Sequence, residues 1–137
     1  MMKTGFTCGT FDLLHAGHIL MFQDAANQCD RLVVGLQTDP SIDRPKKNKP
    51  IQSVEERKIQ LDALRCVDEI IIYETETDLY SILESLRPDV RIIGSDWWEK
   101  NYTGCELEIP IYFHHRQHDY STTNLRKRVK RSEGFMR

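Results

Sequence analysis

Two histidines lie three positions apart in this 137-residue chain, at a point where a strand pattern gives way to a helical one. His15 and His18 follow the short run of residues 6–8, and an apolar helical stripe continues from Ile19, so His18 is expected to open the helix. Gly17, between them, allows a ligand or a backbone segment to come close. Imidazoles beside the free N–H groups of a helix N-terminus suit a phosphate. The spacing therefore predicts a phosphate site, with a turn whose histidines are merely solvated as the alternative.

The whole stretch from residue 9 to residue 18 is more specific than the histidine pair. It reads Gly-Thr-Phe-Asp-Leu-Leu-His-Ala-Gly-His and resembles the GTFDxxHxGH signature of the cytidylyltransferase-type nucleotidyltransferases. Within that family it is most similar to the bacterial glycerol-3-phosphate cytidylyltransferases, and the resemblance extends over residues 3–129. It implies a three-layer α/β, Rossmann-like HxGH nucleotidyltransferase fold built on a five-stranded parallel sheet.

Composition places the chain among globular domains. Hydrophobic residues make up 39% and charged residues 29% of the chain, which argues against disorder. No apolar run is long enough to span a bilayer, and the first residues lack the apolar core of a signal peptide. We therefore expect a cytoplasmic protein without a membrane partner. A net charge of -2 also argues against a nucleic-acid partner.

The length and the cysteines bound the organisation of the chain. The length fits one domain, expected over residues 1–131, followed by a short tail at residues 132–137. The four cysteines are widely spaced and include no C-x-x-C pair, which argues against disulfides and against a zinc site built on cysteine. No protein-bound metal is predicted.

Four further apolar runs predict strands, at residues 31–36, 69–73, 90–93 and 109–113. Helical patterns separate them, and Ser53 with Glu56 forms the capping box of one such helix. A last helix is expected from Asn124 onward, with Leu125 and Val129 facing the core. Strands that alternate with helices in this way imply a parallel sheet with right-handed crossovers.

Two polar segments are expected at the ligand-binding edge of this sheet. Ligands of open parallel sheets bind beyond the carboxyl ends of the strands, which brings Asp96 and Trp97 near the site, since they follow the strand at residues 90–93. The proline-bounded loop at residues 43–50 is basic, and a solvated surface loop is the ordinary interpretation. In the family a lysine-bearing loop at this place contacts the phosphates, and Lys46 is its best match here.

The resemblance also implies a triphosphate site near the end of the chain. Arg116 and the Ser-Thr-Thr run at residues 121–123 keep the spacing of the family's R-T-E-G-I-S-T-T pattern. Residues 117–120 read Gln-His-Asp-Tyr instead of Thr-Glu-Gly-Ile, a departure that bears on the substrate rather than on the reaction type. The nucleotide-binding positions that the resemblance implies are Gly9, Thr10, Phe11, Asp12, His15, His18, Arg65, Asp96, Arg116, Ser121, Thr122 and Thr123.

Further roles follow from the same resemblance. The catalytic positions that it implies are His15, His18, Lys46 and Arg116. The acceptor-binding positions are Asp12, Asp39, Lys46, Arg57 and Trp97. For Arg57, an ion pair with Glu55 or Asp62 is an equally good interpretation of the helix in which it lies. Residues 65–69 resemble a segment near the subunit contact of relatives, and a homodimer is expected.

The function implied is a cytidylyltransferase that moves CMP from CTP to a small phosphorylated alcohol, with glycerol 3-phosphate as the leading acceptor and pyrophosphate as the second product. Mg²⁺ would accompany the triphosphate. One alternative is a related nucleotidyltransferase that uses ATP, or an acceptor such as a phosphonate, a phosphorylated sugar or a sugar alcohol. The alternative of another class is a nucleotide-binding regulatory protein without catalysis.

Overall fold

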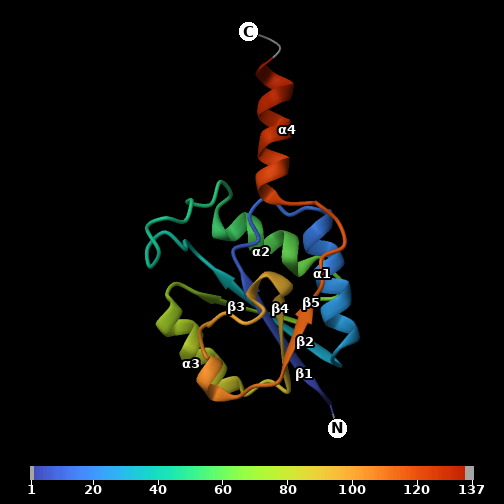
Figure 1. Ribbon diagram of the computed structural model, residues 1–137, viewed down its shortest axis with the longest axis vertical. Helices are drawn as coiled ribbons and strands as arrows, with labels where there is room; N and C mark the ends of the chain where they lie inside the picture. The colour runs from blue at the N-terminus through green and yellow to red at the C-terminus, as the bar shows by residue number, and fades with distance from the viewer. Residues whose placement is uncertain (1, 135–137) are drawn as a thin grey trace.

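Five strands pair into one sheet within residues 2–134, the part of the chain that the computed structural model describes (Figure 1). The strands are β1 (Thr4–Gly9), β2 (Arg31–Gln37), β3 (Glu69–Tyr73), β4 (Val90–Gly94) and β5 (Ile111–His114). All four pairings are parallel, and the strand order is β3-β2-β1-β4-β5. The predicted five-stranded parallel sheet is confirmed.

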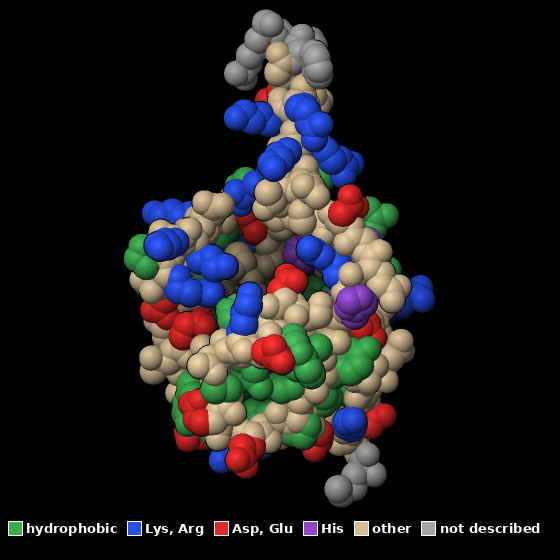
Figure 2. All heavy atoms as spheres, viewed as in Figure 1, with side chains coloured by type: hydrophobic (Ala, Val, Ile, Leu, Met, Phe, Trp, Pro, Cys, Tyr) green, Lys and Arg blue, Asp and Glu red, His purple; other side chains and the backbone are tan. Residues whose placement is uncertain are grey.

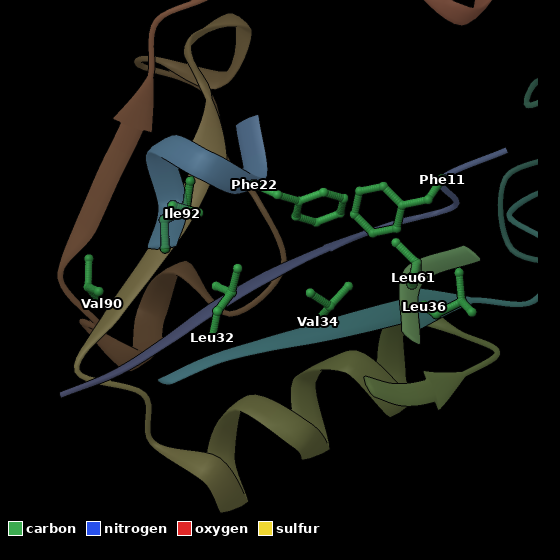
Figure 3. Close-up of a cluster of buried hydrophobic side chains, with 9 residues drawn as sticks. Phe11, Phe22, Leu32, Val34, Leu36, Leu61, Val90 and Ile92 are labelled. Atoms are coloured by element: carbon green, nitrogen blue, oxygen red, sulfur yellow. The ribbon is translucent and has the colours of Figure 1, made fainter. Parts of the chain in front are cut away.

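Helices cover both faces of the sheet. The covering helices are α1 (Ala16–Asn27), α2 (Val54–Asp62) and α3 (Glu76–Leu86). The helix α4 (Thr122–Gly134) projects away from the sheet, and η1 (Ser95–Trp97) and η2 (Cys105–Leu107) are 3₁₀ turns (Figure 1). Phe22 of α1 and Leu61 of α2 pack with Val34 on one face (Figure 3). On the other face, Leu83 of α3 packs with Phe6. Because both faces of the central strands are covered, the centre of β2 at residues 32–36 has no polar side chain. This explains why a continuous apolar run, and not an alternation of apolar and polar residues, predicted this strand.

The direction in which the chain crosses the sheet reverses at β1. From β1 the chain proceeds outward through β2 to β3, and then returns so that β4 pairs with the opposite side of β1. At such a point the loops that follow the two central strands run in opposite directions. They leave a crevice at the carboxyl ends of these strands. The histidine turn follows β1 and η1 follows β4, so the topology brings both segments to this crevice.

Several predicted boundaries differ from the structure: β5 is Ile111–His114 instead of residues 109–113, and α4 begins at Thr122 instead of Asn124. The helix α1 begins at Ala16 rather than at His18, because His15 itself serves as the N-cap. The helix α4 continues to Gly134, so the start of the predicted tail at residues 132–137 is helical and only its last three residues lie outside the described part. Val129 is 56% exposed instead of facing the core, since α4 projects away from the sheet (Figure 1). No helix within residues 2–134 has the length and apolar character needed to cross a membrane.

A buried arginine fixes the loops at the carboxyl edge of the sheet. Arg57 of α2 is 2% exposed, and its guanidinium donates to backbone carbonyls of three separate segments. These acceptors, at 2.6–3.2 Å, are the carbonyl oxygens of Thr10, Gln37, Thr38, Gln52 and Ser53. The guanidinium is therefore unavailable for the acceptor contact predicted from the sequence. The alternative ion pair is also wrong, because Asp62 pairs with Lys58.

We expect Arg57→Lys to lower the free energy of unfolding by at least about 3 kcal/mol, because an ammonium cannot reach carbonyls on three segments and several charged hydrogen bonds are lost. Urea denaturation followed by tryptophan fluorescence measures the effect. Lys58→Gln, the next residue of the same helix, is the control and should cost less than about 1 kcal/mol, since its ion pair is exposed. Equal effects of the two substitutions would contradict the assigned role of Arg57.

Candidate active site

The histidine turn is built by the two imidazoles themselves. His15 Nδ1 accepts a hydrogen bond from the backbone N–H of Gly17 at 3.0 Å, and His18 Nδ1 accepts one from the backbone N–H of His15 at 3.1 Å. The side chains thus perform the capping that Ser, Thr, Asp or Asn usually performs. Because Nδ1 is the acceptor on each ring, the neutral ring carries its proton on Nε2. Each histidine therefore presents one fixed Nε2–H donor.

Both imidazoles are held in the neutral form. Burial lowers the pKa of His18 to about 4, and the neighbouring His15 adds to this effect. Burial also lowers the pKa of His15, with smaller contributions from the neighbouring His118 and from the positive charge of Arg116. The rings of His15 and His18 are stacked with their centroids 3.9 Å apart, so protonating both would put like charges in contact. At neutral pH the pair acts as hydrogen-bond donors rather than as cations.

The ring of Phe11 packs against the ring of His18. The backbone of Phe11, like that of Leu13, is in the left-handed region with φ of 52°, which is strained for a residue with a side chain. The ring is 6% exposed, lies edge-on to His18 at 5.6 Å and packs on Phe22 at 5.0 Å (Figure 3). The buried ring thus positions the histidine, and the nucleotide contact expected for Phe11 stays a prediction.

Asp12 ties three segments together. Its carboxylate, 7% exposed, accepts from the backbone N–H groups of Ile51 and Gln52 at 2.9 Å and from the guanidinium of Arg126 at 3.1 Å. The hydroxyl of Thr122 reaches the carbonyl of Asp12 at 3.4 Å. These contacts fix the base of α4 over the histidine turn. The nucleotide and acceptor contacts implied for Asp12 stay predictions.

Two adjoining cavities open at this edge of the sheet. The smaller, of about 280 Å³, contains both histidines, and the larger, of about 590 Å³, lies over the ends of β1 and β4. Met21 and Gly94 line both, so the cavities are contiguous. Figure 2 shows this face hollowed beneath the base of α4, with Lys and Arg side chains around the hollow and histidine within it.

The structure brings most of the predicted site residues to these cavities. Those that line the smaller cavity are His15, His18, Asp96, Arg116, Ser121 and Thr122, and those that line the larger are Gly9, Thr10 and Trp97. Ser121 also caps α4, since its hydroxyl accepts from the N–H of Asn124 at 3.0 Å.

Other predicted residues lie outside the two cavities. Lys46, Arg65 and Thr123 are exposed. Thr122 lines the smaller cavity, but the next residue, Thr123, does not. Asp39 closes a local turn by accepting from Ser41, whose hydroxyl is the main reason that the pKa of Asp39 is lowered. The homodimer expected from residues 65–69 stays a prediction.

Two basic residues, Arg44 and Arg126, were missed from the sequence, and Lys47 was expected only as an aid to Lys46. Arg44 and Lys47, from the same basic loop as Lys46, line the larger cavity. Arg126 reaches Asp12 from one turn into α4. Arg126 could have been identified from its position shortly after the Ser-Thr-Thr run, on the same predicted helix. The choice between Lys46 and Lys47 depends on how the loop folds, which spacing alone does not determine.

The fold and the site agree with a family model described as cytidylyltransferase-like, which matches residues 6–128. The chain belongs to the cytidylyltransferase-like family. The bifunctional protein HldE of Helicobacter pylori is 37% identical to this cytidylyltransferase-like chain over 131 residues, covering 95% of the chain and 28% of HldE. HldE of Hyphomonas neptunium is 43% identical over 107 residues, covering 77% and 22% respectively. The chain thus spans about a quarter of the length of these curated relatives.

Solved structures agree with this assignment. The lipopolysaccharide core biosynthesis protein of Thermoplasma volcanium superposes on the cytidylyltransferase-like chain with a TM-score of 0.68 and 26% identity, covering 88% of this chain and 100% of its own. Pantothenate synthetase of Thermus thermophilus superposes with a TM-score of 0.57 over 83% of this chain and 55% of its own. Its identity is 14%, so it shares the fold alone. The chain is therefore a nucleotidyltransferase-family domain.

We expect the free energy of unfolding to fall as the pH drops from about 6.5 towards 4. In this interval the unfolded chain protonates His18 at its ordinary pKa of 6.5, whereas the folded chain resists protonation down to a pKa of about 4. The unfolded state therefore binds more protons, and stability that is complete above pH 6.5 is lost on acidification. The shift corresponds to on the order of 3 kcal/mol.

Urea denaturation at several pH values across this interval measures that slope. His18→Gln should flatten it, because the titrating group is removed. His115→Gln, on an exposed position of the β5–α4 loop, should leave it unchanged. A slope that is the same in both variants would show that His18 is not the group responsible.

Proposed function

We propose that this domain transfers a nucleotidyl group from a nucleoside triphosphate to a phosphorylated sugar or sugar alcohol and releases pyrophosphate. The observation that carries the proposal is the junction of the two cavities, where fixed Nε2–H donors of His15 and His18 adjoin a larger polar cleft. Neutral donors at the point where a phosphate reacts and an adjacent acceptor cleft are what this transfer needs.

The reaction asks for alignment rather than for a protein nucleophile. A phosphate oxygen of the acceptor forms a bond to the α-phosphorus, the bond from that phosphorus to the bridging oxygen breaks, and the electron pair leaves with pyrophosphate. In this scheme His15 and His18 hydrogen-bond the α-phosphate while its charge redistributes, and Arg116 with Ser121 and Thr122 holds the phosphates that leave. Arg126, which donates to the carboxylate of Asp12, adds positive charge at the same edge of the sheet.

The larger cleft is suited to a polyhydroxylated acceptor. Its volume of about 590 Å³ falls within the usual range of small-molecule sites, about 300–1,000 Å³, and leaves room for more than a three-carbon phosphate. Arg44 and Lys47 supply positive charge for the acceptor phosphate, and Trp97 closes one wall. Gln37 and Glu76 offer polar groups that can hydrogen-bond the hydroxyls of a sugar acceptor. These features support a phosphorylated sugar above glycerol 3-phosphate, the acceptor expected from the sequence.

The relatives also support a phosphorylated sugar as the acceptor. The Thermoplasma volcanium structure is titled as a lipopolysaccharide core biosynthesis protein, and lipopolysaccharide cores are built from sugars. The description of the matched family supports CTP as the donor, with ATP as the alternative that the test below separates. Catalysis is supported above a purely regulatory role, because the histidine donors, Arg116 and the hydroxyls of α4 share one cavity.

Mg²⁺ is proposed as the ion that accompanies the triphosphate. No cluster of three His, Cys, Asp or Glu arranged to hold a metal occurs within residues 2–134. In general Mg²⁺ binds mainly through substrate phosphates with one or two protein carboxylates. Asp96 lines the smaller cavity and is the carboxylate placed to contribute. When bound, the ion would neutralise charge on the phosphates.

We expect pyrophosphate release to require both a nucleoside triphosphate and a phosphorylated sugar. The assay crosses CTP, ATP, GTP and UTP with pentose, hexose and heptose phosphates and with glycerol 3-phosphate. The best sugar phosphate should exceed glycerol 3-phosphate in kcat/KM by at least about tenfold, because the smaller acceptor leaves polar groups of the cleft unpaired. A preference for glycerol 3-phosphate would overturn the acceptor assignment, and no turnover with any pair would overturn the reaction.

We expect His18→Ala to lower kcat by about 10²–10³ while leaving nucleotide affinity nearly unchanged, because its hydrogen bond strengthens as charge shifts in the transition state. Steady-state kinetics give kcat, and calorimetry gives the Kd of the triphosphate. Lys47→Ala should instead raise the KM of the acceptor, since its charge acts already in the ground state. Equal losses of affinity and kcat in His18→Ala, with a lower Tm, would make His18 a folding residue.

A further inference from the structure

The loop between β5 and α4 folds back onto the histidine turn. In this loop residues 117–120 depart from the family pattern, and they place a third imidazole beside the first two. His118 Cε1 lies 3.0 Å from the position that a Cβ on Gly17 would occupy, and His15 Cε1 lies 2.9 Å from the same point. A side chain at position 17 would collide with both rings, so the glycine allows the two segments to meet.

His118 has the same hydrogen-bond arrangement as the two histidines of the turn. Its Nδ1 accepts from the backbone N–H of Tyr120 at 3.0 Å, and its ring packs on that of Tyr120 with centroids 4.7 Å apart. Because Nδ1 is the acceptor, the neutral ring carries its proton on Nε2. The loop therefore fixes the tautomer of His118 as the helix N-terminus fixes those of His15 and His18.

The Nε2 atom of His118 is buried and has no hydrogen-bond partner within residues 2–134. A buried donor without a partner is costly, and native proteins rarely keep one without a reason. His118 lines the smaller cavity together with His15, His18 and Arg116. The missing partner is thus expected to be a ligand of that cavity, and the positive charge of Arg116 favours an anion.

His114 provides an instructive contrast in the same cavity. Its Nε2 is also buried without a partner in the described chain, but its Nδ1 lies 2.7 Å from the carboxylate of Asp24. There Nδ1 is the donor, so a neutral His114 has an acceptor at Nε2. His118, whose Nδ1 is an acceptor, is the histidine of this loop that matches the donor pattern of the active-site pair.

We propose that His118 is a third phosphate-binding histidine, which donates a hydrogen bond from Nε2 to the pyrophosphate as it leaves. In an in-line displacement the leaving group departs opposite the attacking oxygen. The acceptor cleft lies over β1 and β4, and His118 does not line it, whereas it shares the smaller cavity with Arg116 and Ser121. His118 thus lies on the side from which pyrophosphate departs.

The inference rests on the proposed function, and it specifies one contact within it. When the bond from the α-phosphorus to the bridging oxygen breaks, the electron pair and negative charge move onto pyrophosphate. A fixed neutral donor at this place stabilises that charge without adding a cation next to the His15–His18 stack. No proton is transferred by His118 in this step.

The test uses two substitutions at one position. In His118→Asn the amide oxygen can replace Nδ1 and accept from Tyr120, but the Nε2–H donor is lost. In His118→Gln the amide nitrogen takes a place near Nε2 and keeps a donor. His115→Asn, an exposed histidine of the same loop, is the matched control. The measurements are kcat with the best substrate pair, the Kd of inorganic pyrophosphate by calorimetry, and Tm.

We expect His118→Asn to lower kcat by roughly 10²-fold and to weaken pyrophosphate binding, with Tm close to that of His115→Asn. His118→Gln should recover a large part of both losses. If His118→Asn matches His115→Asn in kcat and in pyrophosphate affinity, the inference is overturned while the proposed function stands. A fall in Tm with a proportionate loss of activity in both His118 variants would also overturn it. If the unmodified protein neither turns over nor binds pyrophosphate, the proposed function itself fails.

Discussion

The loops at the carboxyl edge of the sheet depend on one buried cation, the guanidinium of Arg57. The guanidinium of Arg57 is almost free of solvent and is satisfied entirely by backbone carbonyls from the turn after β1, the end of β2 and the approach to α2. A charge inside a protein is tolerated only when its donors are paired, so these segments are held in one arrangement. Asp12 closes the same region from the other side by accepting from residues 51–52 and from α4. The crevice at the switch point is therefore organised before any ligand arrives.

Within this frame the histidines serve as neutral donors. Their Nδ1 atoms are occupied by backbone N–H groups, burial disfavours their charged forms, and Phe11 holds the ring of His18 from below. Positive charge is supplied by other residues, Arg116 in the same cavity and the basic loop beside the larger one. This separation suits phosphoryl-type transfer, because donors with fixed direction act where charge shifts and mobile cations hold charge that is already present.

The scaffold and its variable parts can be distinguished on the same physical grounds. The turn after β1 and the base of α4 are fixed by buried polar contacts, and their residues follow the family pattern. The loop at residues 117–120 departs from that pattern. It supplies His118 to the smaller cavity, and η1 supplies Trp97 to the larger. Such a departure changes which side chains line the cavities while the buried polar contacts of the scaffold stay in place.

The sequence by itself determined the alternation of strands and helices, the parallel sheet and the histidine turn, because each is encoded by local spacing. Only the tertiary structure decided where Arg57, Lys47 and His118 lie. Arg57 meets Thr10 across 47 positions, and no local pattern reveals such a contact. The basic loop presents several equivalent lysines, and its fold selects the one that lines the cleft. His118 gained its place from the close approach of two distant segments at Gly17, which depends on the whole domain being packed.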